Sequence, residues 1–339
     1  MKITFKNVGQ GDSILLEWQK KDAPFTHLGI IDCKKHDSGN PVLEHIIESG
    51  TREIEFIILS HPHFDHYSGM LDVLNHCESK NIRIHFFGFS LGDSQLYFKL
   101  FNKSEEAAKL LTSILKKVQA LKKTGRIDRL RRIAERWDYP LNEDFSIRCL
   151  APAGEEEFLF VEKVKIFNEK SNEYSSSQAA NLLSTIFLIE SKSKDSGVIL
   201  TSDSCFETFE RIREKNMGDF KKFKLLLCQI PHHGAIENHQ MEFWSKLDYE
   251  INCPAIVSAG QHKRYSHPSK EVVRDFHDHS FKIHSTNFVN GMQDFFSEKA
   301  DNVSLKLGMA SEVFENLEME GDQVFQLTTD TVIYFPRRN

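Results

Sequence analysis

The sequence predicts a layered α/β protein, and three observations support this fold class. Strand-like and helix-like runs alternate through most of the 339 residues, which is the pattern of α/β architectures. The run "EFIILS" (55–60) contains an unbroken apolar stretch, as expected for a strand buried on both faces. Hydrophobic residues make up 40% and charged residues 27% of the chain, which is enough apolar content for a full core.

The first 90 residues predict strands joined by turns and two helices. The strands are expected at "KITFKNV", "SILLEW", "HLGIIDC" and "EFIILS", with "GQGD" as a turn between the first two. A helix is expected at "PVLEHIIESG", where Gly50 ends it, and another at "YSGMLDVLNHC".

Residues 95–140 predict an inserted helical hairpin. The first helix is indicated by an apolar stripe and the second by a shorter one after Gly125; the two stripes are Leu111, Ile114, Val118, Leu121 and Ile127, Leu130, Ile133. Residues 153–180 are rich in Glu, Lys, Asn and Ser and are interpreted as a long loop, either without regular structure or with one short strand. Strands and helices alternate again up to residue 295, so we expect one domain over 1–295 and a C-terminal extension over 296–339.

Bulk properties exclude several classes of protein. The net charge of −6 provides no overall positive field for nucleic acid. The N-terminus has no signal-peptide core, and no run is apolar enough to span a membrane. The six cysteines are scattered without a CxxC, which indicates reduced thiols and a cytoplasmic location.

The stretch "LSHPHFDHYSGM" (59–70) places four metal-binding side chains at the end of the apolar strand. Alternate residues of an extended segment point the same way, so His61 and His63 can hold one ion. Asp65 and His66, where the chain turns into the next helix, can face a second ion. Imidazole and carboxylate ligands suit Zn²⁺, Mn²⁺ or Fe²⁺. The alternative, a solvated histidine-rich loop, fits poorly with the buried strand before it.

The sequence resembles the metallo-β-lactamase superfamily. "SHPHFDH" matches its HxHxDH signature, and further matches follow in order: "VILTSDS" (198–204), "QIPHHGA" (229–235) and "SAGQHKRYSHPSKEVV" (258–273). With "VGQGDSILL" and "HSTNFVNG", the set is similar to the soluble domain of the competence protein ComEC and its relatives. The resemblance covers 1–90 and 145–295. It implies a four-layer αββα fold, here with the helical hairpin inserted and the C-terminal extension added.

The resemblance also implies a ligand set for two metals. His61 and His63 would hold the first metal, Asp65 and His66 the second, and Asp203 would bridge them. One histidine of "HHG" would complete the second site; His233 is favoured, with His232 facing substrate, but the reverse assignment stays open. Where many members have a third histidine for the first metal, this chain has Asn181. An amide oxygen is a harder ligand and favours Mn²⁺ over Zn²⁺, unless Asn181 only caps its strand.

Three further groups are candidates around the metals. His267, in "SHPS", is expected to be a proton donor or phosphate contact, and Asp12 to orient a ligand histidine. Lys263 and Arg264 are candidate phosphate contacts. As alternatives, His267 is a surface histidine, Asp12 a turn residue, and the two cations ordinary solvated charges. Cys33 and Ser202 stand where glycine is usual in the family, so they either narrow the pocket or signal partial degeneration.

These observations predict a hydrolase with two divalent metal ions, Zn²⁺ or Mn²⁺, most consistent with a phosphodiesterase or nuclease that uses a metal-bridging hydroxide. The expected substrate is nucleic acid or a nucleotide phosphodiester, and the basic segment 116–132 is a candidate phosphate-binding surface. Its alternatives are a solvated helix face, or docking of the insert on a protein partner or a second copy. The alternative functions are hydrolysis of a thioester, lactone or lactam, and a non-catalytic subunit.

Overall fold

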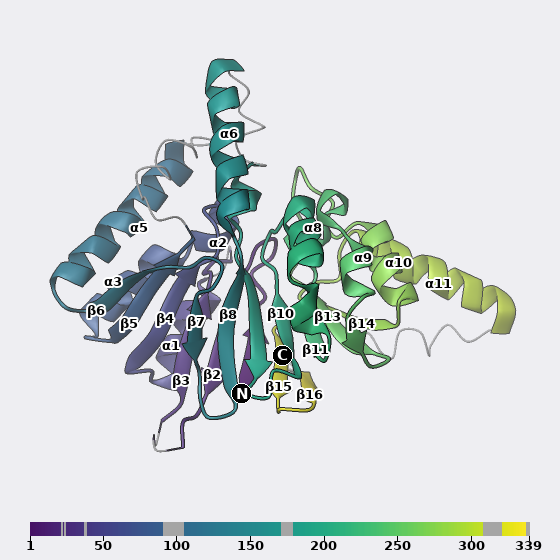
Figure 1. The fold of residues 1–339 in the computed structure, drawn as a ribbon, viewed down its shortest axis with the longest axis horizontal. Helices are drawn as coiled ribbons and strands as arrows, with labels where there is room; N and C mark the ends of the chain where they lie inside the picture. Colours follow the sequence, from purple (N-terminus) through teal and green to yellow (C-terminus); the bar gives the residue numbers. More distant parts are fainter. Residues whose placement is uncertain are drawn as a thin grey trace.

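The computed structural model describes all residues except 22, 24, 37, 38, 91–104, 171–178, 308–320 and 337–339. Side chains are also left undescribed at 164–170, 219, 300–307 and 336. Within this part of the chain, two β-sheets face each other and helices cover both outer faces (Figure 1). This is the four-layer αββα arrangement that the sequence predicted.

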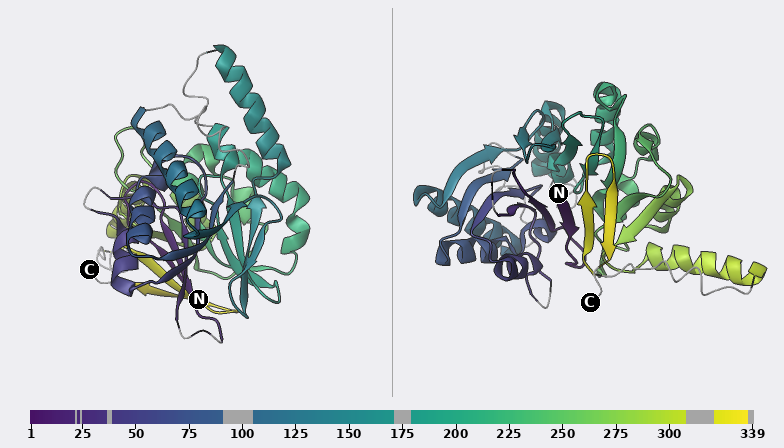
Figure 2. Two further views of the ribbon diagram at one scale, coloured as in Figure 1. Left: turned by 90° about the vertical axis from the view of Figure 1, so that its left-hand side faces the viewer. Right: turned by 90° about the horizontal axis from the view of Figure 1, so that it is seen from below.

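The first sheet has the strand order β16-β15-β1-β2-β3-β4-β5-β6. Its strands are β1 (Lys2–Phe5), β2 (Ile14–Trp18), β3 (His27–Ile31), β4 (Glu53–Leu59), β5 (Arg83–Phe89), β6 (Ile127–Arg132), β15 (Gln323–Leu327) and β16 (Val332–Pro336). Strands β3 to β6 are parallel, so their carboxyl ends lie at one edge of the sheet. Strand β15 pairs with β1, so residues of the expected C-terminal extension complete this sheet beside the N-terminal strand (Figure 2).

The second sheet has the order β14-β13-β11-β10-β9-β8-β7, with β12 beside β11. Its strands are β7 (Asp138–Pro140), β8 (Phe145–Ala151), β9 (Ile186–Ser191), β10 (Ser196–Leu200), β11 (Lys224–Gln229), β12 (Asp248–Tyr249), β13 (Cys253–Val257) and β14 (Phe281–Ser285). Strands β10, β11, β13 and β14 run parallel, and their carboxyl ends again share one edge.

The helices fall into two groups, one for each sheet. The helices are α1 (Pro41–Ser49), α2 (Phe64–Tyr67), α3 (Met70–Ser79), α5 (Glu105–Lys123), α6 (Gly154–Lys170), α8 (Phe206–Lys215), α9 (Met241–Trp244), α10 (Lys270–Asp278) and α11 (Gly291–Leu307), and the 3₁₀ turns are η1 (Asn181–Leu183), η2 (Met217–Phe220), η3 (Pro231–Gly234) and η4 (Ile236–Asn238). Helices α1, α3 and α5 pack on the first sheet, and α8, α9 and α10 on the second. None of the described helices is long and apolar enough to cross a membrane.

Three apolar clusters hold the layers together. One lies between the first sheet and its helices, one between the second sheet and its helices, and the third between the sheets. In the third cluster, Phe56 of β4 and Leu227 of β11 are fully buried from opposite sheets. Burial on both faces explains the apolar runs at residues 56–59 of β4 and 225–228 of β11. At the ends of such strands, polar side chains can reach solvent.

Helix α1 shows how local sequence sets an element. Asn40 accepts a hydrogen bond from the Leu43 amide, Pro41 occupies the first turn, and Gly50 adopts a left-handed φ of 63° that ends the helix. The predicted helix at "YSGMLDVLNHC" is confirmed as α3. All six cysteines are free thiols, as predicted, and five of them are buried.

The prediction of a second helix in the hairpin is wrong. Residues 127–132 form β6, which pairs in parallel with β5, so α5 and β6 extend the first sheet. Two or three apolar residues at this spacing fit a short strand as well as a helix, and pairing with β5 satisfies the strand's backbone. Residues 95–104 of the predicted insert lie outside the described residues.

The predicted loop over 153–180 is also wrong in its first half, where residues 154–170 form α6. Glu155, Glu156 and Glu157 occupy its first turn, where carboxylates favour a helix N-terminus. Its polar composition hid the helix, because the segment has only a weak apolar stripe. Residues 171–178 lie outside the described part of the chain.

Candidate metal centre

The predicted metal-binding side chains converge at one edge of the two sheets. Each follows a strand end or lies in the first turn after it. His61 and His63 follow β4, Asp65 and His66 lie in α2, Asp203 follows β10, and His232 and His233 lie in η3 after β11. Carboxyl ends of parallel strands meet at a common edge, which explains how residues 170 positions apart come together.

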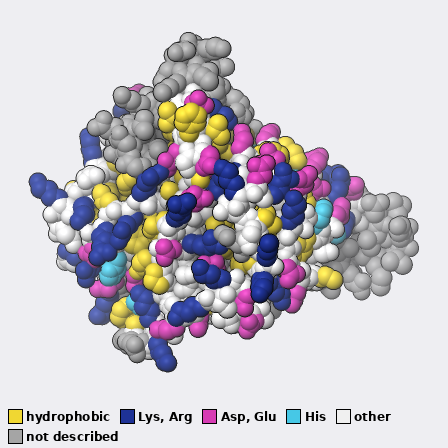
Figure 3. Space-filling view, in the orientation of Figure 1, with side chains coloured by type: hydrophobic (Ala, Val, Ile, Leu, Met, Phe, Trp, Pro, Cys, Tyr) yellow, Lys and Arg dark blue, Asp and Glu magenta, His cyan; other side chains and the backbone are white. Residues whose placement is uncertain are grey.

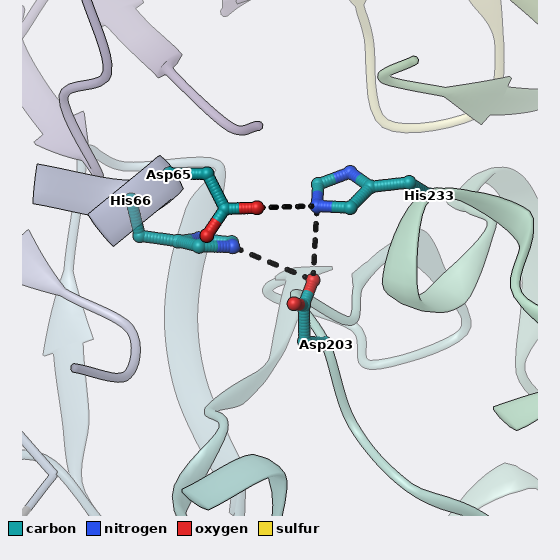
Figure 4. A group of neighbouring side chains, drawn as sticks. All are labelled: Asp65, His66, Asp203 and His233. Atoms are coloured by element: carbon teal, nitrogen blue, oxygen red, sulfur yellow. Dashed lines mark ion pairs between the residues drawn. The ribbon is translucent and has the colours of Figure 1, made fainter. Parts of the chain in front are cut away.

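Asp65, His66, His233 and Asp203 form one group, which we call the second site (Figure 4). The Nε2 atoms of His66 and His233 each lie 3.4 Å from Oδ1 of Asp203. His233 Nε2 also lies 3.5 Å from Oδ2 of Asp65. All four side chains therefore present ligand atoms to a common point.

His61, His63 and Asp203 form the other group, which we call the first site. His61 Nε2 lies 3.0 Å from His63 Nδ1 and 3.4 Å from Oδ2 of Asp203. Asp203 thus directs one carboxylate oxygen to each site. This is the arrangement required of a residue that bridges two metals.

The ring nitrogens of His66 and His233 that face away from the second site have fixed partners. Asp32 Oδ2 lies 2.7 Å from His66 Nδ1, and the Ser258 carbonyl lies 2.7 Å from His233 Nδ1. Both oxygens accept, so each Nδ1 carries the proton and each Nε2 keeps a lone pair for the second site. Asp32 was not among the residues predicted from the sequence, although it follows β3 directly, as His61 and His63 follow β4.

The residues fit divalent metal ions. Within the described residues, Nε2 of His66, Nε2 of His233 and Oδ1 of Asp203 are buried without a hydrogen-bond partner. Such atoms are costly unless a cation satisfies them. Metal–nitrogen distances of about 2.0–2.1 Å place tetrahedral ligand atoms about 3.3–3.4 Å apart, close to the separations seen here. The donor set of imidazole and carboxylate suits Zn²⁺ or Mn²⁺.

Hydroxyl groups support the first site. Ser60 Oγ and Ser202 Oγ each lie 3.2 Å from His61 Nδ1, and they lie 2.7 Å from each other. Ser202 has a φ of 49°, the left-handed region that favours glycine. Unlike a glycine, Ser202 has a hydroxyl group, and this group contacts His61. Cys33, the other residue at a usual glycine position, is buried with its Sγ 3.7 Å from Asn40 Oδ1.

Backbone strain is concentrated around the two sites. Asp32, Ser202, His232 and His233 all have positive φ, at 60°, 49°, 46° and 54°. Non-glycine residues in this region cost on the order of 1–3 kcal/mol each and persist where the surroundings enforce them. The hydrogen bond from the His232 amide to the Ser202 carbonyl, 3.0 Å long, ties two of these strained turns together.

Burial and charge separate the pKa values of the histidines. Burial, with His61 beside it, lowers the pKa of His63 to about 3. Burial also acts to lower the pKa of His233, but the Asp203 carboxylate outweighs it and raises that pKa to about 9. The pKa of His66 is raised for the same reason, by Asp203 and Asp32 against burial. Without metal, therefore, the second site holds protons on its histidines.

The pKa values of the two carboxylates, Asp65 and Asp203, are shifted by the same burial and by the neighbouring histidines. Burial acts to raise the pKa of Asp65, but the His233 ring, whose Nε2 lies 3.5 Å from its Oδ2, and the charge of His66 lower that pKa overall. The pKa of Asp203 is likewise lowered, because the surrounding histidines outweigh burial. Both carboxylates are therefore ionised near neutral pH, as metal ligands must be.

Asp12 lies behind the second site. Its Oδ2 accepts a hydrogen bond of 2.9 Å from Gln229 Nε2 and lies 4.0 Å from His66 Nδ1. Burial raises its pKa. The direct partner of His66 Nδ1 is Asp32, at 2.7 Å, whereas Asp12, at 4.0 Å, is beyond hydrogen-bond distance of this nitrogen.

The remaining predicted residues lie beside the sites. Asn181, buried in η1, has its amide nitrogen 3.4 Å from His232 Nδ1. The rings of His267 and His232 are 5.7 Å apart, and burial lowers the pKa of His267 to about 4. Lys263 and Arg264 are exposed on the loop before His267.

Comparison with known proteins agrees with this architecture. The family model described as the metallo-beta-lactamase superfamily matches residues 35–145, which contain the HxHxDH stretch. No curated protein matches the chain in sequence. Over residues 35–145 the chain is therefore similar to the metallo-β-lactamase superfamily, and the candidate ligands His61, His63, Asp65 and His66 lie within the matched segment.

Solved structures with a similar course of the chain have low sequence identity. A CmlA beta-hydroxylase mutant is 11% identical with a TM-score of 0.41, over 84% of this chain and 52% of that one. A diphosphatase of the PhnP family is 14% identical with a TM-score of 0.35, over 76% and 85%. The YhfI protein of Bacillus subtilis is 12% identical with a TM-score of 0.40, over 85% and 98%. The chain spans about half the length of the first of these.

Proposed function

We propose that the protein is a hydrolase with two divalent metal ions that cleaves phosphodiesters in nucleic acid or nucleotides. Residues 35–145, which match the model of the metallo-beta-lactamase superfamily, contain four of the candidate ligands. The observation that carries the proposal is the position of the Asp203 carboxylate: its Oδ2 faces His61 of the first site, and its Oδ1 faces His66 of the second. Paired metals, when bound, activate water and neutralise the oxygens of an in-line displacement at phosphorus.

The chain's own residues would hold the centre in a productive state. Asp203 fixes the spacing of the two sites, and Asp65 adds negative charge to the second site only. Asp32 and the Ser258 carbonyl keep the Nε2 lone pairs of His66 and His233 directed inward. Ligands locked in this way need little rearrangement when the ions bind.

The phosphodiester proposal draws on the "HHG" and "SHPS" segments, which match the ComEC-like pattern and here lie side by side. His267 lies beside His232, and Lys263 and Arg264 are exposed in the same loop. Burial keeps the His267 ring neutral near pH 7. A bound phosphate would raise its pKa, so that His267 could carry the proton needed by the leaving oxygen.

The experiment compares the wild type with Asp65→Ala, each supplied with Mn²⁺, on bis-p-nitrophenyl phosphate and on single- and double-stranded DNA. Asp278→Ala, which removes an exposed carboxylate of α10, is the matched control. We expect hydrolysis by the wild type and the control, and a loss of about 100-fold or more in Asp65→Ala because one ion loses a ligand. Equal activity in all three proteins would contradict the proposal.

Parallel assays on a thioester, a lactone and a lactam test the other hydrolytic classes. Hydrolysis of one of these without hydrolysis of bis-p-nitrophenyl phosphate would contradict the phosphodiester substrate but not the two-metal centre. A wild-type chain that retains well under one metal per molecule would instead favour a non-catalytic subunit.

The basic segment 116–132 supports nucleic acid as the larger substrate. It covers the end of α5 and strand β6, where Figure 3 shows Lys and Arg side chains over the left-hand end of the molecule. Some of these cations are paired: Lys117 with Glu78, and Arg132 with Glu157. Arg129 and Arg131 are exposed and alternate along β6, so they share one face.

Strand β6 is two strands from β4, which leads into His61. Neighbouring strands are about 4.8 Å apart, so β6 lies about 10 Å to the side of β4. Arg129→Gln with Arg131→Gln should therefore weaken DNA binding and reduce the dependence of log Kd on log salt by about 1–2 units. The control is Lys221→Gln with Lys222→Gln, two exposed lysines just before β11, at the end of that strand opposite to the metals. An unchanged slope in the arginine variant would show that β6 does not contact phosphate.

A further inference from the structure

His232 is held at the edge of the first site by one strong contact. It lies in η3 with a φ of 46°, and its Nδ1 is 2.7 Å from Oδ1 of Asn238. Its Nε2 is 3.5 Å from Oδ2 of Asp203, the carboxylate oxygen that also faces His61. His232 therefore faces the first site, whereas its neighbour His233 faces the second.

The orientation of the Asn238 amide is fixed. Its Nδ2 donates to the backbone carbonyls of Ser204, at 2.9 Å, and Asp203, at 3.4 Å. Carbonyl oxygens can only accept, so the nitrogen of the amide faces them and the oxygen faces His232. Asn238 is buried, which leaves the amide no solvent partner to turn towards.

The tautomer of His232 follows from this orientation. An amide oxygen can only accept, so Nδ1 of His232 must carry the hydrogen of the 2.7 Å bond. In the neutral ring, Nε2 then carries a lone pair directed at the Asp203 carboxylate. Two electron-rich atoms 3.5 Å apart repel unless a cation lies between them, and the separation is close to the value of about 3.3–3.4 Å expected for two ligands of one ion.

Asn181 is the competing ligand, because its Oδ1 is buried without a hydrogen-bond partner in the described residues. Its amide nitrogen, however, lies 3.4 Å from Nδ1 of His232, whereas Asp203 faces Nε2 of that ring. Imidazole nitrogen is also the better ligand for Zn²⁺ and comparable ions. Asn181 is therefore placed to pack behind His232.

We propose that His232 is the third protein ligand of the first site, and that Asn238 is the residue that positions it. His232 thus takes the role that the sequence pattern gave to position 181. The close group of His61, His63 and Asp203 does not include His232, whose side chain is 25% exposed. It is accordingly the outermost and most labile ligand. The inference rests on the proposed two-metal centre but not on its substrate.

The experiment measures bound Co²⁺ per chain by equilibrium dialysis, with the visible absorption of Co²⁺ as a second readout of ligand number. The proteins are the wild type, His232→Ala, His232→Asn, Asn238→Ala and Asn181→Ala. His232→Asn keeps a donor near the position of Nδ1 and removes Nε2, so it separates lost ligation from a disturbed turn. Thermal unfolding of each metal-free protein checks that the fold is retained.

We expect two ions in the wild type and one tightly bound ion in both His232 variants, with affinity for the other reduced about 10-fold or more. Asn238→Ala should weaken the same ion about 10-fold, as is typical when the partner of a ligand histidine is removed. Asn181→Ala should resemble the wild type. Loss of the ion in Asn181→Ala with retention in both His232 variants would overturn the assignment. Fewer than two ions in the wild type would refute the two-metal centre itself, and this assignment with it.

Discussion

The two candidate metal sites share Asp203 but differ in how their histidines are held. In the second site, His66 and His233 donate to a carboxylate and to a backbone carbonyl, both at 2.7 Å. In the first site, Nδ1 of His61 contacts the hydroxyls of Ser60 and Ser202, both at 3.2 Å. A hydroxyl can rotate and either donate or accept, whereas a carboxylate or carbonyl only accepts. The second site is therefore the more firmly organised, and we expect it to bind metal more tightly.

The largest effect is expected where the sites meet. Asp203→Asn keeps the shape of the side chain but removes the charge shared by both sites. We expect loss of both ions and a fall in phosphodiesterase activity of about 1000-fold or more, equivalent to about 4 kcal/mol. Elemental analysis and hydrolysis of bis-p-nitrophenyl phosphate measure the two losses. Retention of one tightly bound ion would show that one site is complete without Asp203.

Smaller effects are expected from variants of the residues that hold the ligand histidines in the two sites. Asp32→Asn should weaken the second site by about 10- to 100-fold, because His66 loses its charged partner. Ser202→Gly should weaken the first site only a few-fold, since Ser60 still contacts His61. Competitive chelator titrations of each variant measure the affinities. A greater loss from Ser202→Gly than from Asp32→Asn would reverse the comparison.

The next prediction concerns protons released on metal binding. The metal-free pKa of His233 is about 9, so at pH 7 the ring is protonated and must lose its proton before Nε2 can bind an ion. Affinity at the second site should therefore rise with pH from 7 towards 9. His63, with a pKa of about 3, is already neutral and releases no proton in this range. Calorimetry in buffers of different ionisation enthalpy counts the protons, and equal release at the two sites would contradict the difference.

The sequence indicated the candidate ligands more clearly than the residues that hydrogen-bond to them. Adjacent residues such as His61, His63, Asp65 and His66 reveal themselves by spacing alone. Asp32 and Asn238 carry no such signal, because each acts on a histidine that only the folded chain brings near. The tautomer of His232 depends on Asn238 and on two backbone carbonyls, which no spacing rule can supply.

The fold shows the same division. The apolar run of β4 and the amphipathic stripe of α5 were recognisable, because burial leaves a clear pattern. Strand β6 was mistaken for a helix because a short segment with few apolar residues suits both structures. Helix α6 was mistaken for a loop because its favourable features are acidic residues at its start, with little apolar periodicity.

The most direct test of the account is a titration of metal-free protein with Mn²⁺, following bis-p-nitrophenyl phosphate hydrolysis and bound metal together. If the second site fills first and both sites are needed, activity should stay low up to one ion per chain and rise to a plateau at two. Asp65→Ala should bind one ion and remain inactive. Full activity at one ion or fewer, or a wild type that never binds a second ion, would contradict the two-metal account.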